Sequence, residues 1–512
     1  MYIPSFLSVE TLVLLITSLV LVRIYIHKKW QFLKNINIPH IQPTILQLGT
    51  VRPFIGNSDW MMNSHEYCKR KLGKIYGAYL FLTPQITVAD PDIIKQMYIK
   101  EFATFPTRQT SLTKINGKVM NTTILMTEGE QWKRIRNTLT PSFSTAKLKE
   151  MLGIMEDCCN HAINILIKTT QNDQGKFEAK SVFGKLALDI TCSAAFSVDT
   201  HPQELKDGQE PKIIKMVKQA FGFEISRSPL VMLCFMFPAF EEILCKLDYS
   251  IIPKDTVNYF ANLTKSLIDQ RKHSTVKPRV DLMQLMLNDQ ISVEDVAKGK
   301  SKGLTQLEIT SNSVLMVLAG YDTSANALTL LAYNLATHKH VQKKVQEEID
   351  KMLEKYGSLT YEALNSMKYL GMCLNETLRL YPPIAVNSRI PNRDITINGV
   401  FLPKGIQVIV PVYGMSRDEE IWEEPLKFKP ERMEDMRSVD SMIFQPFGGG
   451  PRGCIGMRFA VLEIKLAIAK ILQDFNLDVC ENTPKPPVQL EFKSTTLKPK
   501  GDIYLRVTPK SN

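Results

Sequence analysis

Residues 447–456 read FGGGPRGCIG, and the chemistry of this loop decides how the rest of the chain is interpreted. Three of its glycines match G-x-G-x-x-G, the pattern of a loop that binds a dinucleotide pyrophosphate at a helix N-terminus: Gly448, Gly450 and Gly453. Cys454 follows directly and is a candidate metal ligand. An apolar run precedes the loop and acids follow about 20 residues on, at Asp474 and Asp478, as a dinucleotide site requires. The local sequence leaves a phosphate loop and a thiolate loop both open.

The composition indicates a large globular chain with reduced thiols. Its 512 residues are 44% hydrophobic, which excludes disordered and fibrous classes. The nine cysteines are odd in number and include neither a C-x-x-C pair nor metal-finger spacing, so we expect thiols facing the cytosol instead of a disulfide scaffold. The net charge of +11 is spread thinly. It predicts attraction to an anionic membrane surface or an acidic protein partner, and no nucleic-acid partner.

The N-terminus has the length and charge pattern of a membrane anchor. Residues 2–22 carry one charge, Glu10, and basic residues follow from Arg23 on. About 20 apolar residues suffice to span a bilayer. A cleaved signal peptide is the alternative, but it would carry positive charge before the apolar region and a small-residue cleavage site after it. We expect an anchor at residues 1–26 with the body in the cytosol, then a connector at 27–54 that its prolines stiffen.

The remaining residues, 55–512, are expected to form one mainly helical domain with small β-sheets. Apolar periodicity predicts long helices at 142–170, 179–196, 251–273, 304–338, 340–354 and 455–474. Strand-like stretches are short and local, at 76–90, 394–412 and 502–508. Strands and helices do not alternate one for one, which argues against a doubly wound parallel sheet.

The helix expected at 304–338 would be about 52 Å long and is apolar on nearly every face. It is either a second membrane span or the buried central helix of a helical body, and its cluster of polar side chains around Asp322 favours the buried helix. Its AGYDTS stretch has two interpretations. Thr323 can bond back to the preceding turn in a polar kink, which the pattern alone favours. Alternatively, Gly320 opens a groove for a ligand to which Asp322 and Thr323 relay protons.

Two further motifs place cations beside an acid or an indole. In NETLRLYPP, Glu376 and Arg379 are three apart on one helical face among leucines, so a buried pair is plausible and needs a further partner, for which Arg432 in FKPERM is suited. An exposed pair of little energetic value is the alternative. In WKRIR, Trp132 and Arg136 share one helix face, which suits an anionic carboxylate ligand, although a solvated basic helix gives the same pattern.

The order of these motifs resembles one family. WxxxR, AGxDT, ExxR, FxPER and FGGGPRGC follow one another over some 300 residues, as in the cytochrome P450 haem-thiolate monooxygenases. The resemblance extends from the anchor to about residue 508 and is closest to the microsomal drug-metabolising branch, in particular its 3A-like subfamily. It implies the cytochrome P450 fold, mainly α with small β-sheets, behind one N-terminal transmembrane helix. Pro451 agrees with a thiolate loop, since it lacks the N–H that a phosphate cradle would use.

The resemblance implies haem b as the cofactor, with Cys454 as the axial ligand of its iron and Phe447 packed beside the sulfur. A thiolate at a helix N-terminus is stabilised as the anion and donates electron density to the iron. The implied ligands of the haem propionates are cations and one indole: Arg108, Trp132, Arg136, Arg389 and Arg452. Arg108 and Arg389 rest on weaker local matches than the other three.

The resemblance also assigns the remaining motifs. Thr323 and Asp322 look like the alcohol and acid that steer protons to bound dioxygen, and Ala319 would face the haem. Glu376, Arg379 and Arg432 resemble a buried triad that governs folding and haem retention.

The implied reaction inserts one oxygen atom from O₂ into a lipophilic substrate, a xenobiotic, steroid or other lipid. Electrons come from NADPH through NADPH-cytochrome P450 reductase, with cytochrome b5 as a second possible donor. The implied location is the endoplasmic reticulum membrane, with a single-pass anchor and the catalytic domain in the cytosol. An isomerase or dehydratase of the thromboxane-synthase kind is the alternative within the fold, and Thr323 argues against it because such relatives tend to lack the distal hydroxyl. A membrane-tethered haem carrier or sensor is the alternative outside enzymes.

Overall fold

The computed structural model describes residues 9–45, 49–50, 59–108, 115–172, 174–196, 211–222, 228–237, 239–247, 249–273, 281–435, 439–492 and 496–510. The first eight residues of the expected anchor, and residues 46–48 and 51–54 of the expected connector, lie outside this part. The chain divides into two compact units. The first unit comprises Met1–Ser111, Ser226–Glu241 and Ser388–Pro411, and the second comprises Leu112–Ile225, Glu242–Asn387 and Val412–Asn512.

The first unit combines the N-terminal helix with a small sheet. Its elements are α1 (Val9–Trp30), α2 (Phe32–Asn35), α3 (Asp59–Leu72), β1 (Ile75–Leu80), β2 (Thr83–Val88), α4 (Pro91–Lys95), the π-helical turn η2 (Gln96–Lys100), α10 (Pro229–Met236), β4 (Asn387–Arg389), β5 (Ile395–Ile397), β6 (Val400–Leu402) and β7 (Gln407–Val410). The four-stranded sheet has the order β1-β2-β7-β4, with β1 and β2 antiparallel and β2 and β7 parallel. Strands β5 and β6 form a separate antiparallel pair.

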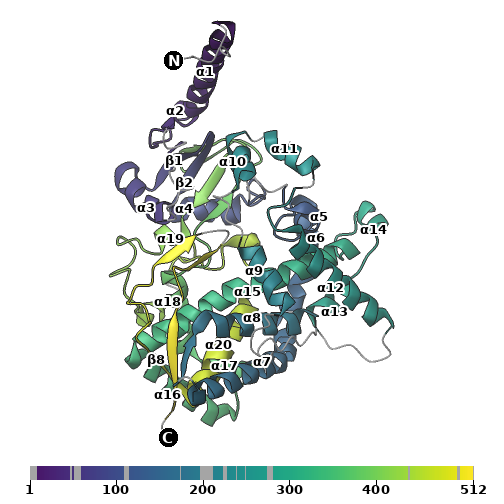
Figure 1. Cartoon of the computed structure of the whole chain (residues 1–512), viewed down its shortest axis with the longest axis vertical. Helices are drawn as coiled ribbons and strands as arrows, with labels where there is room; N and C mark the ends of the chain where they lie inside the picture. The colour runs from purple at the N-terminus through teal and green to yellow at the C-terminus, as the bar shows by residue number, and fades with distance from the viewer. Residues whose placement is uncertain are drawn as a thin grey trace, which may run out of the picture. The chain divides into compact units, whose positions relative to one another are not determined.

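Helix α1 stands away from the rest of the first unit (Figure 1). None of its 22 residues is buried, and its apolar side chains cover every face. Together with α2 it forms a segment, Val9–Asn35, that is long and apolar enough to cross a membrane. A helix that exposes so much apolar surface has the properties of the predicted membrane anchor.

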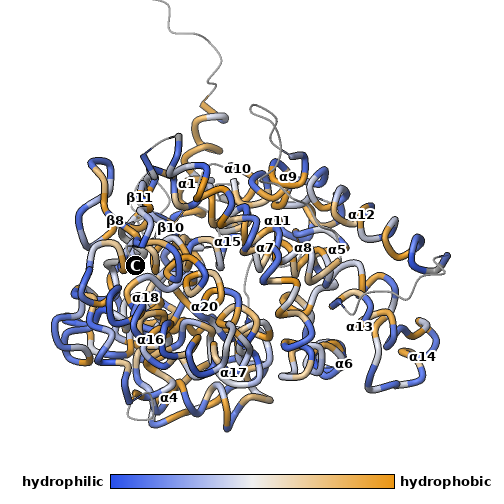
Figure 2. Tube along the Cα trace, turned by 90° about the horizontal axis from the view of Figure 1, so that it is seen from below, coloured by the Kyte–Doolittle hydropathy of each residue, from blue (hydrophilic) through white to orange (hydrophobic). Residues whose placement is uncertain are grey.

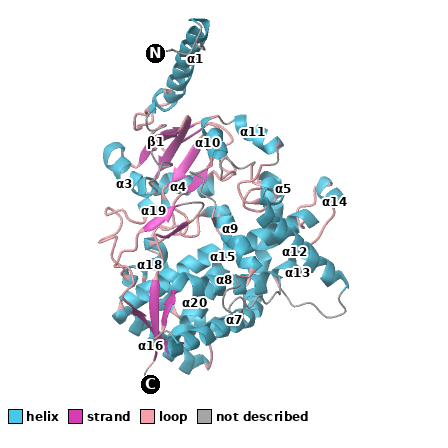
Figure 3. Cartoon of the chain, in the orientation of Figure 1, coloured by secondary structure: helices cyan, strands magenta, loops and turns pink. Residues whose placement is uncertain are grey.

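The second unit is mainly helical (Figure 3). Its elements are α5 (Gly117–Asn121), α6 (Gly129–Leu139), η3 (Thr140–Phe143), α7 (Thr145–Asn172), β3 (Lys176–Glu178), α8 (Ala179–Phe196), α9 (Lys212–Phe221), α12 (Lys254–His273), α13 (Leu282–Asn288), α14 (Val293–Ala297), α15 (Gln306–Thr337), α16 (Lys339–Tyr356), α17 (Tyr361–Ser366), α18 (Lys368–Leu380), α19 (Val412–Met415), η5 (Pro430–Met433), η6 (Gly450–Arg452), α20 (Met457–Asp474), β8 (Phe475–Val479), β9 (Leu490–Phe492), β10 (Leu497–Pro499) and β11 (Tyr504–Pro509). Helix α11 (Ala239–Lys246) begins in the first unit and ends in the second.

Helix α15 is the core of the second unit. Thr305 and Glu308 form a capping box at its start, each side chain accepting from the other residue's backbone N–H. Most of the helix is buried, including 72% of its most apolar window, so the expectation of a buried central helix is confirmed over a second membrane span. It packs against α8, α12, α18 and α20. A Cβ at Gly320 would lie 2.7 Å from Oγ1 of Thr191 on α8. The space that the AGYDTS stretch offers at Gly320 is therefore taken by helix packing, and not by a ligand.

The predicted fold class is confirmed. The six long helices expected from periodicity correspond to α7, α8, α12, α15, α16 and α20, and the three strand regions contain β1–β2, β5–β7 and β11. The second unit adds a three-stranded sheet of order β3-β11-β8 and the pair β10-β9. Four of its strands gave no clear signal in the sequence, and three of those span only three residues each. So short a stretch has too few residues to show a period of two.

Candidate active site

The backbone conformation of the loop before α20 depends on its glycines. Gly448 and Gly450 have φ angles of 73° and 66°, which glycine adopts without steric cost. The amide of Gly453 donates to the carbonyl of Gly450 at 2.8 Å, and the amide of Cys454 donates to the carbonyl of Phe447 at 2.8 Å. The Cys454 side chain is exposed, three residues before α20 begins. The loop thus presents a thiol at a helix N-terminus, where the helix dipole stabilises the thiolate.

The same geometry excludes the dinucleotide interpretation. The amides of Gly453 and Cys454 bond within the loop and are not available to a pyrophosphate. Residues 439–447, all of which the structure describes, form turns instead of the strand that a dinucleotide fold places before its loop. Asp478, an acid at the spacing of a ribose ligand, pairs with Lys339 and accepts from Thr508 at 2.8 Å.

One face of α6 meets this loop. Arg136 donates from Nη1 to the carbonyl of Gly453 at 2.9 Å. The guanidinium carbon of Arg452 lies 4.2 Å from the ring centroid of Trp132, and its Nη2 donates to the carbonyl of Thr127 at 3.0 Å. Arg452 is only 2% exposed. The structure therefore brings Trp132, Arg136 and Arg452 together around the Cys454 loop.

Burial lowers the pKa of Arg136, and the neighbouring Cys454 opposes that shift because a thiolate stabilises the guanidinium cation. The interaction is reciprocal. A cation in this position favours the anionic form of the cysteine, which is the form that binds metals.

The other two predicted arginines lie in the first unit. The hydroxyl of Ser388 donates to the carbonyl of Arg108, and Thr107 forms a β-bridge with Ile390, so the segments that carry Arg108 and Arg389 are neighbours. The guanidinium carbon of Arg389 lies 4.3 Å from the ring centroid of Tyr98. Burial lowers the pKa of Arg389 and raises that of Tyr98 to about 12.

Helix α15 has one open strip in its otherwise buried centre. Ala319 is exposed, and Leu315 and Thr323, one turn to either side, are half-buried. The Thr323 hydroxyl donates to the carbonyl of Ala319 at 2.7 Å, as Thr does in a helix when no other acceptor is present. Leu315 packs on the same apolar cluster as Ile455, the residue after Cys454. The strip and the thiol loop therefore border one apolar cluster of the second unit.

Asp322 lies on a different side of α15 from Thr323, since successive helical residues are about 100° apart. Its Oδ1 pairs with Nζ of Lys180 at 3.0 Å, and its Oδ2 accepts from Thr496 at 2.5 Å and from Asn326 at 3.2 Å. The carboxylate is buried, whereas the Lys180 side chain is 31% exposed. The acid thus reaches solvent through its lysine partner.

Glu376, Arg379 and Arg432 form a buried ionic triad. Arg379 donates from Nε and Nη2 to the two carboxylate oxygens of Glu376, each at 2.8 Å, and Arg432 donates to Oε1 at 3.0 Å. The amide of Lys429 adds a fourth bond at 3.0 Å, and Nη1 of Arg379 donates to the carbonyl of Ser416 at 2.6 Å. Both Glu376 and Arg379 are completely buried. Every bond of the triad is within the protein, so it joins α18 to η5 and the loop before it.

Comparison with known proteins decides the family. Residues 40–506 match the model of the family described as Cytochrome P450. Cytochrome P450 3A25 of Mus musculus is 38% identical over 511 residues, which cover 98% of this chain and 97% of that protein. Lithocholate 6-beta-hydroxylase of Mesocricetus auratus and Cytochrome P450 3A5 of Homo sapiens are each 36% identical, over 98% of this chain and 97% of each relative.

The chain belongs to the cytochrome P450 family. It is therefore an oxidoreductase of the monooxygenase class, and a haem cofactor is implied. Because haem brings four nitrogen ligands of its own, the protein would supply a thiolate for the iron and cations for the propionates. The residues present fit this requirement. Cys454 is exposed, Arg136 donates to the carbonyl of the residue before it, and Arg452 lies two positions before it in the same loop.

Two buried carboxylates of this cytochrome P450 were missed in the sequence. Glu308 receives a bidentate ion pair from Arg134 of α6, at 2.6 and 2.8 Å, and Arg134 also donates to the carbonyl of Gly303 at 2.7 Å. Burial alone would raise the pKa of Glu308, but the bonds from Arg134, the Thr305 amide and Gln131 lower it. The T-x-x-E pattern of a capping box could have predicted a role for Glu308. No pattern predicts the role of Arg134, because the W-x-x-x-R spacing in WKRIR marks the helix face of Trp132 and Arg136 instead.

The second is Glu463 of α20, which is 1% exposed. Neither of its oxygens has a hydrogen bond of good geometry with any residue in the described part of the chain. Burial raises its pKa to about 8, and the nearby Ser324 hydroxyl opposes the shift. Burial therefore favours the protonated, neutral form of Glu463. An isolated acid in an apolar helix leaves no local pattern from which to predict this.

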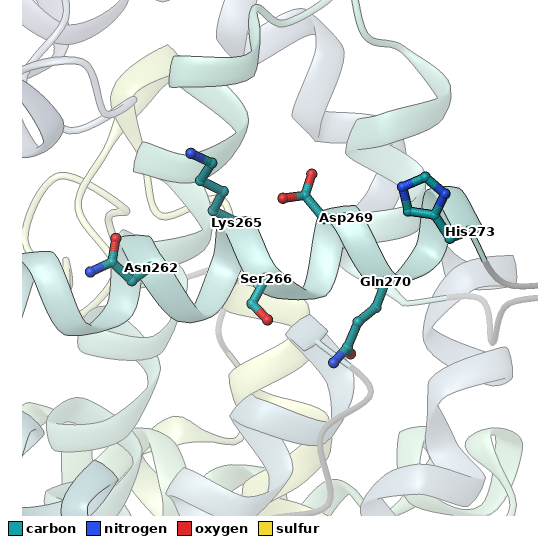
Figure 4. A pocket seen from close by; sticks show the side chains of 6 residues that line it. All are labelled: Asn262, Lys265, Ser266, Asp269, Gln270 and His273. Carbon is teal, nitrogen blue, oxygen red and sulfur yellow. The ribbon is translucent and has the colours of Figure 1, made fainter.

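A groove of about 570 Å³ lies at the surface along α12. Six polar side chains of this one helix line it (Figure 4): Asn262, Lys265, Ser266, Asp269, Gln270 and His273. Figure 2 shows polar and apolar residues alternating along α12, as in a helix with one solvent-exposed and one buried face. Because residues of one helix face line it, the groove is open to solvent and does not enclose a ligand as a small-molecule site does.

Proposed function

We propose that the protein is a membrane-bound haem-thiolate monooxygenase. It takes two electrons from NADPH through a reductase, inserts one atom of O₂ into a lipophilic substrate and releases the other as water. The observation that carries the proposal is the exposed Cys454 thiol at the N-terminus of α20, next to a carbonyl that Arg136 holds. Bound haem supplies the redox chemistry and the activation of oxygen.

Cys454 would hold the haem iron as the thiolate, with Phe447 packed beside the sulfur. The α20 N-terminus and the Arg136 cation stabilise that anion. Trp132, Arg136 and Arg452 would bind the haem propionates, since they are an indole donor and two partly desolvated cations on one side of the loop. Arg108 and Arg389 of the first unit are proposed for the same role on their chemistry and the family resemblance.

Ala319 is proposed to face the haem and Thr323 to hand protons toward the site of oxygen activation. The position of Thr323 on the open strip of α15 supports this, because its hydroxyl can leave the Ala319 carbonyl for a new acceptor. Asp322 would draw protons from solvent through its contact with the half-exposed Lys180. Glu376, Arg379 and Arg432 would preserve the fold behind the haem, since both arginines donate to the buried Glu376 carboxylate.

We further propose anchoring through α1 in the endoplasmic reticulum membrane, with NADPH-cytochrome P450 reductase as electron donor and cytochrome b5 as a second donor. The apolar α1 and the 3A relatives support this. One relative is named as a lithocholate 6-beta-hydroxylase. We propose substrates of comparable lipophilic character, which include steroids and xenobiotics.

The carbon-monoxide difference spectrum of the reduced protein in membranes tests the thiolate. We expect the strongly red-shifted Soret band of thiolate-ligated haem in the parent and its loss in Cys454→Ala. Cys245→Ala is the matched control, because Cys245 is also exposed but lies on α11. Folded protein without haem would contradict the proposal.

Substrate-dependent NADPH consumption in the presence of reductase then separates the enzyme classes. A monooxygenase consumes NADPH and O₂ as product forms. A haem carrier consumes neither, and an isomerase of the thromboxane-synthase kind forms product without NADPH.

A further inference from the structure

The hydroxyl of Tyr79 joins the end of α1 to the sheet of the first unit. Helix α1 ends at Trp30 and α2 begins at Phe32, and a break between helices leaves carbonyls and amides without intrahelical partners. The Tyr79 hydroxyl, from strand β1, satisfies one of each. It donates to the carbonyl of Trp30 at 2.8 Å and accepts from the amide of Leu33 at 2.9 Å. Tyr79 is completely buried, so the phenol has no water to replace these bonds.

Two more contacts fix the same junction. The indole Nε1 of Trp30 donates to the carbonyl of Phe81 at 2.9 Å, in the turn between β1 and β2. Leu33 is completely buried over Gly77, where an added Cβ would lie 2.6 Å from Cδ1 of the leucine. An alanine at position 77 would therefore force the Leu33 side chain to move.

The residues that follow α2 continue the attachment. The amide of Gly77 donates to the carbonyl of Pro39 at 2.7 Å, and His40 forms a parallel bridge with Gly77. Within the connector expected at residues 27–54, Pro39 and His40 therefore pair with the backbone of β1 at Gly77. Hydrogen bonds, a buried side chain and backbone pairing together hold the end of α1 to strand β1.

We infer that α1 is a rigid extension of the first unit, clamped by Tyr79, and that it sets the β1–β2 turn at the headgroup level of an anionic lipid bilayer. This rests on the proposed membrane anchor. Tryptophan prefers the membrane–water interface, and Trp30 is bonded directly to the turn at Phe81. Lys28, Lys29 and Lys34 are exposed around the junction, where they match anionic headgroups.

An exposed apolar side chain extends the lipid-facing surface. Ile45 is 58% exposed, beside Thr44, which pairs with Gly49, and Gly49 in turn pairs with Leu80 next to the β1–β2 turn. The surface offered to the bilayer therefore comprises the turn, Ile45 and the three lysines. A flexible tether would let this surface leave the membrane, whereas the clamp does not.

Hydrogen exchange of the full-length protein in phosphatidylcholine nanodiscs with one-quarter phosphatidylserine tests the clamp. The Leu33 amide should be protected in the parent and should exchange about tenfold faster in Tyr79→Phe, which loses both bonds of the phenol. Tyr76→Phe is the matched control. Tyr76 is a buried tyrosine of the same strand, but its hydroxyl contacts His65, so Leu33 exchange should not change.

A distance measurement reports on rigidity independently. Spin-labelled unnatural residues at Leu19 in α1 and at the exposed Lys95 in α4 avoid the nine native cysteines. We expect a narrow distance distribution in the parent and in Tyr76→Phe, and a broad one in Tyr79→Phe. Thermal midpoints of both variants establish that each remains folded.

The outcomes separate the clamp from the anchor. If the α1 amides are protected by the bilayer but Leu33 exchanges freely and the distances are broad in the parent, the clamp is overturned and the anchor stands. If the α1 amides exchange freely in nanodiscs, the anchor proposal fails, and the membrane inference fails with it. Protection of Leu33 that Tyr79→Phe does not change would also overturn the role of the phenol.

Discussion

The guanidinium of Arg136 donates to the carbonyl of Gly453, the residue that precedes Cys454, across 317 positions of sequence. This bond joins helix α6 to the thiol loop and brings a cation within the electrostatic range of the sulfur. We therefore expect Arg136→Leu to fold but to release haem about tenfold faster, since it loses a charge-assisted bond and the proposed partner of a haem propionate. Haem transfer to apomyoglobin measures the rate.

Lys133→Leu is the control for that experiment. Lys133 is on the same helix but 63% exposed, in a loose pair with Glu130. Equal haem release from both variants would contradict the assignment of Arg136.

Glu376→Gln should destabilise the fold severely. It leaves two guanidinium groups, those of Arg379 and Arg432, without their shared buried counter-charge, a change that costs about 3–5 kcal/mol. The free energy of unfolding and the yield of haem-loaded protein measure the effect. Glu150→Gln is the matched control, because it breaks an ion pair of the same i,i+3 spacing with Lys147 at the surface, where about 1 kcal/mol or less is at stake.

Arg134 and Glu308 should behave as a coupled pair. Arg134→Met alone leaves the Glu308 carboxylate buried without its cation, and we expect a loss of about 3–5 kcal/mol. The double variant Arg134→Met, Glu308→Leu should recover much of that loss, because no unpaired charge remains. Denaturation of the four proteins in a double-mutant cycle gives the coupling energy. Additive losses would show that the pair does not act as a unit.

Glu463→Gln should stabilise the protein increasingly as pH rises. The pKa of Glu463 is about 8 in the folded state against an ordinary value near 4.5, so the folded state holds a proton that the unfolded state releases. Protonated Glu463 therefore contributes to the free energy of unfolding fully below pH 4.5. As pH rises from 4.5 to 8, this contribution falls by about 1.4 kcal/mol per pH unit. Glutamine does not titrate and avoids the loss.

Thermal midpoints of Glu463→Gln and its parent at pH 5.5, 7 and 8.5 test this. Glu431→Gln is the opposite control: hydrogen bonds from Lys344 and Tyr369 outweigh burial and lower the pKa of Glu431 to about 2, so its effect should be constant over the same range. A difference between Glu463→Gln and its parent that does not grow with pH would place the folded pKa of Glu463 near its ordinary value.

Thr323→Ala should uncouple electron use from product formation. If Thr323 delivers protons as proposed, its loss from the open strip of α15 should lower product per NADPH about tenfold or more and raise hydrogen peroxide. Thr323→Ser should restore coupling. Thr337→Ala, which removes a similar back-bonded hydroxyl at the far end of α15, should leave coupling unchanged. Unchanged coupling in Thr323→Ala would remove the residue from the proton route.

The sequence predicts those parts of the molecule whose information is local. Helix α15 follows from apolar periodicity, and the pairing of Glu376 with Arg379 follows from their spacing on one helix turn. The partners of Asp322 do not follow, because Lys180 and Thr496 are 142 and 174 residues away. Gly320 shows the same limit: the motif suggests open space, and only the fold reveals that Thr191 of α8 fills it.

The contact between Leu33 and Gly77 has a practical consequence for shortened forms of the protein. A chain that lacks residues 1–26 would keep Trp30, Leu33 and the pairing of residues 39–40 with Gly77, and it should remain folded in water. A chain that lacks residues 1–35 would lose Leu33, which covers Gly77, and would expose the Tyr79 side chain that is buried in the full-length protein. Expression designs that remove the apolar segment should therefore cut ahead of Trp30, because Trp30 donates to the carbonyl of Phe81 and Leu33 covers Gly77.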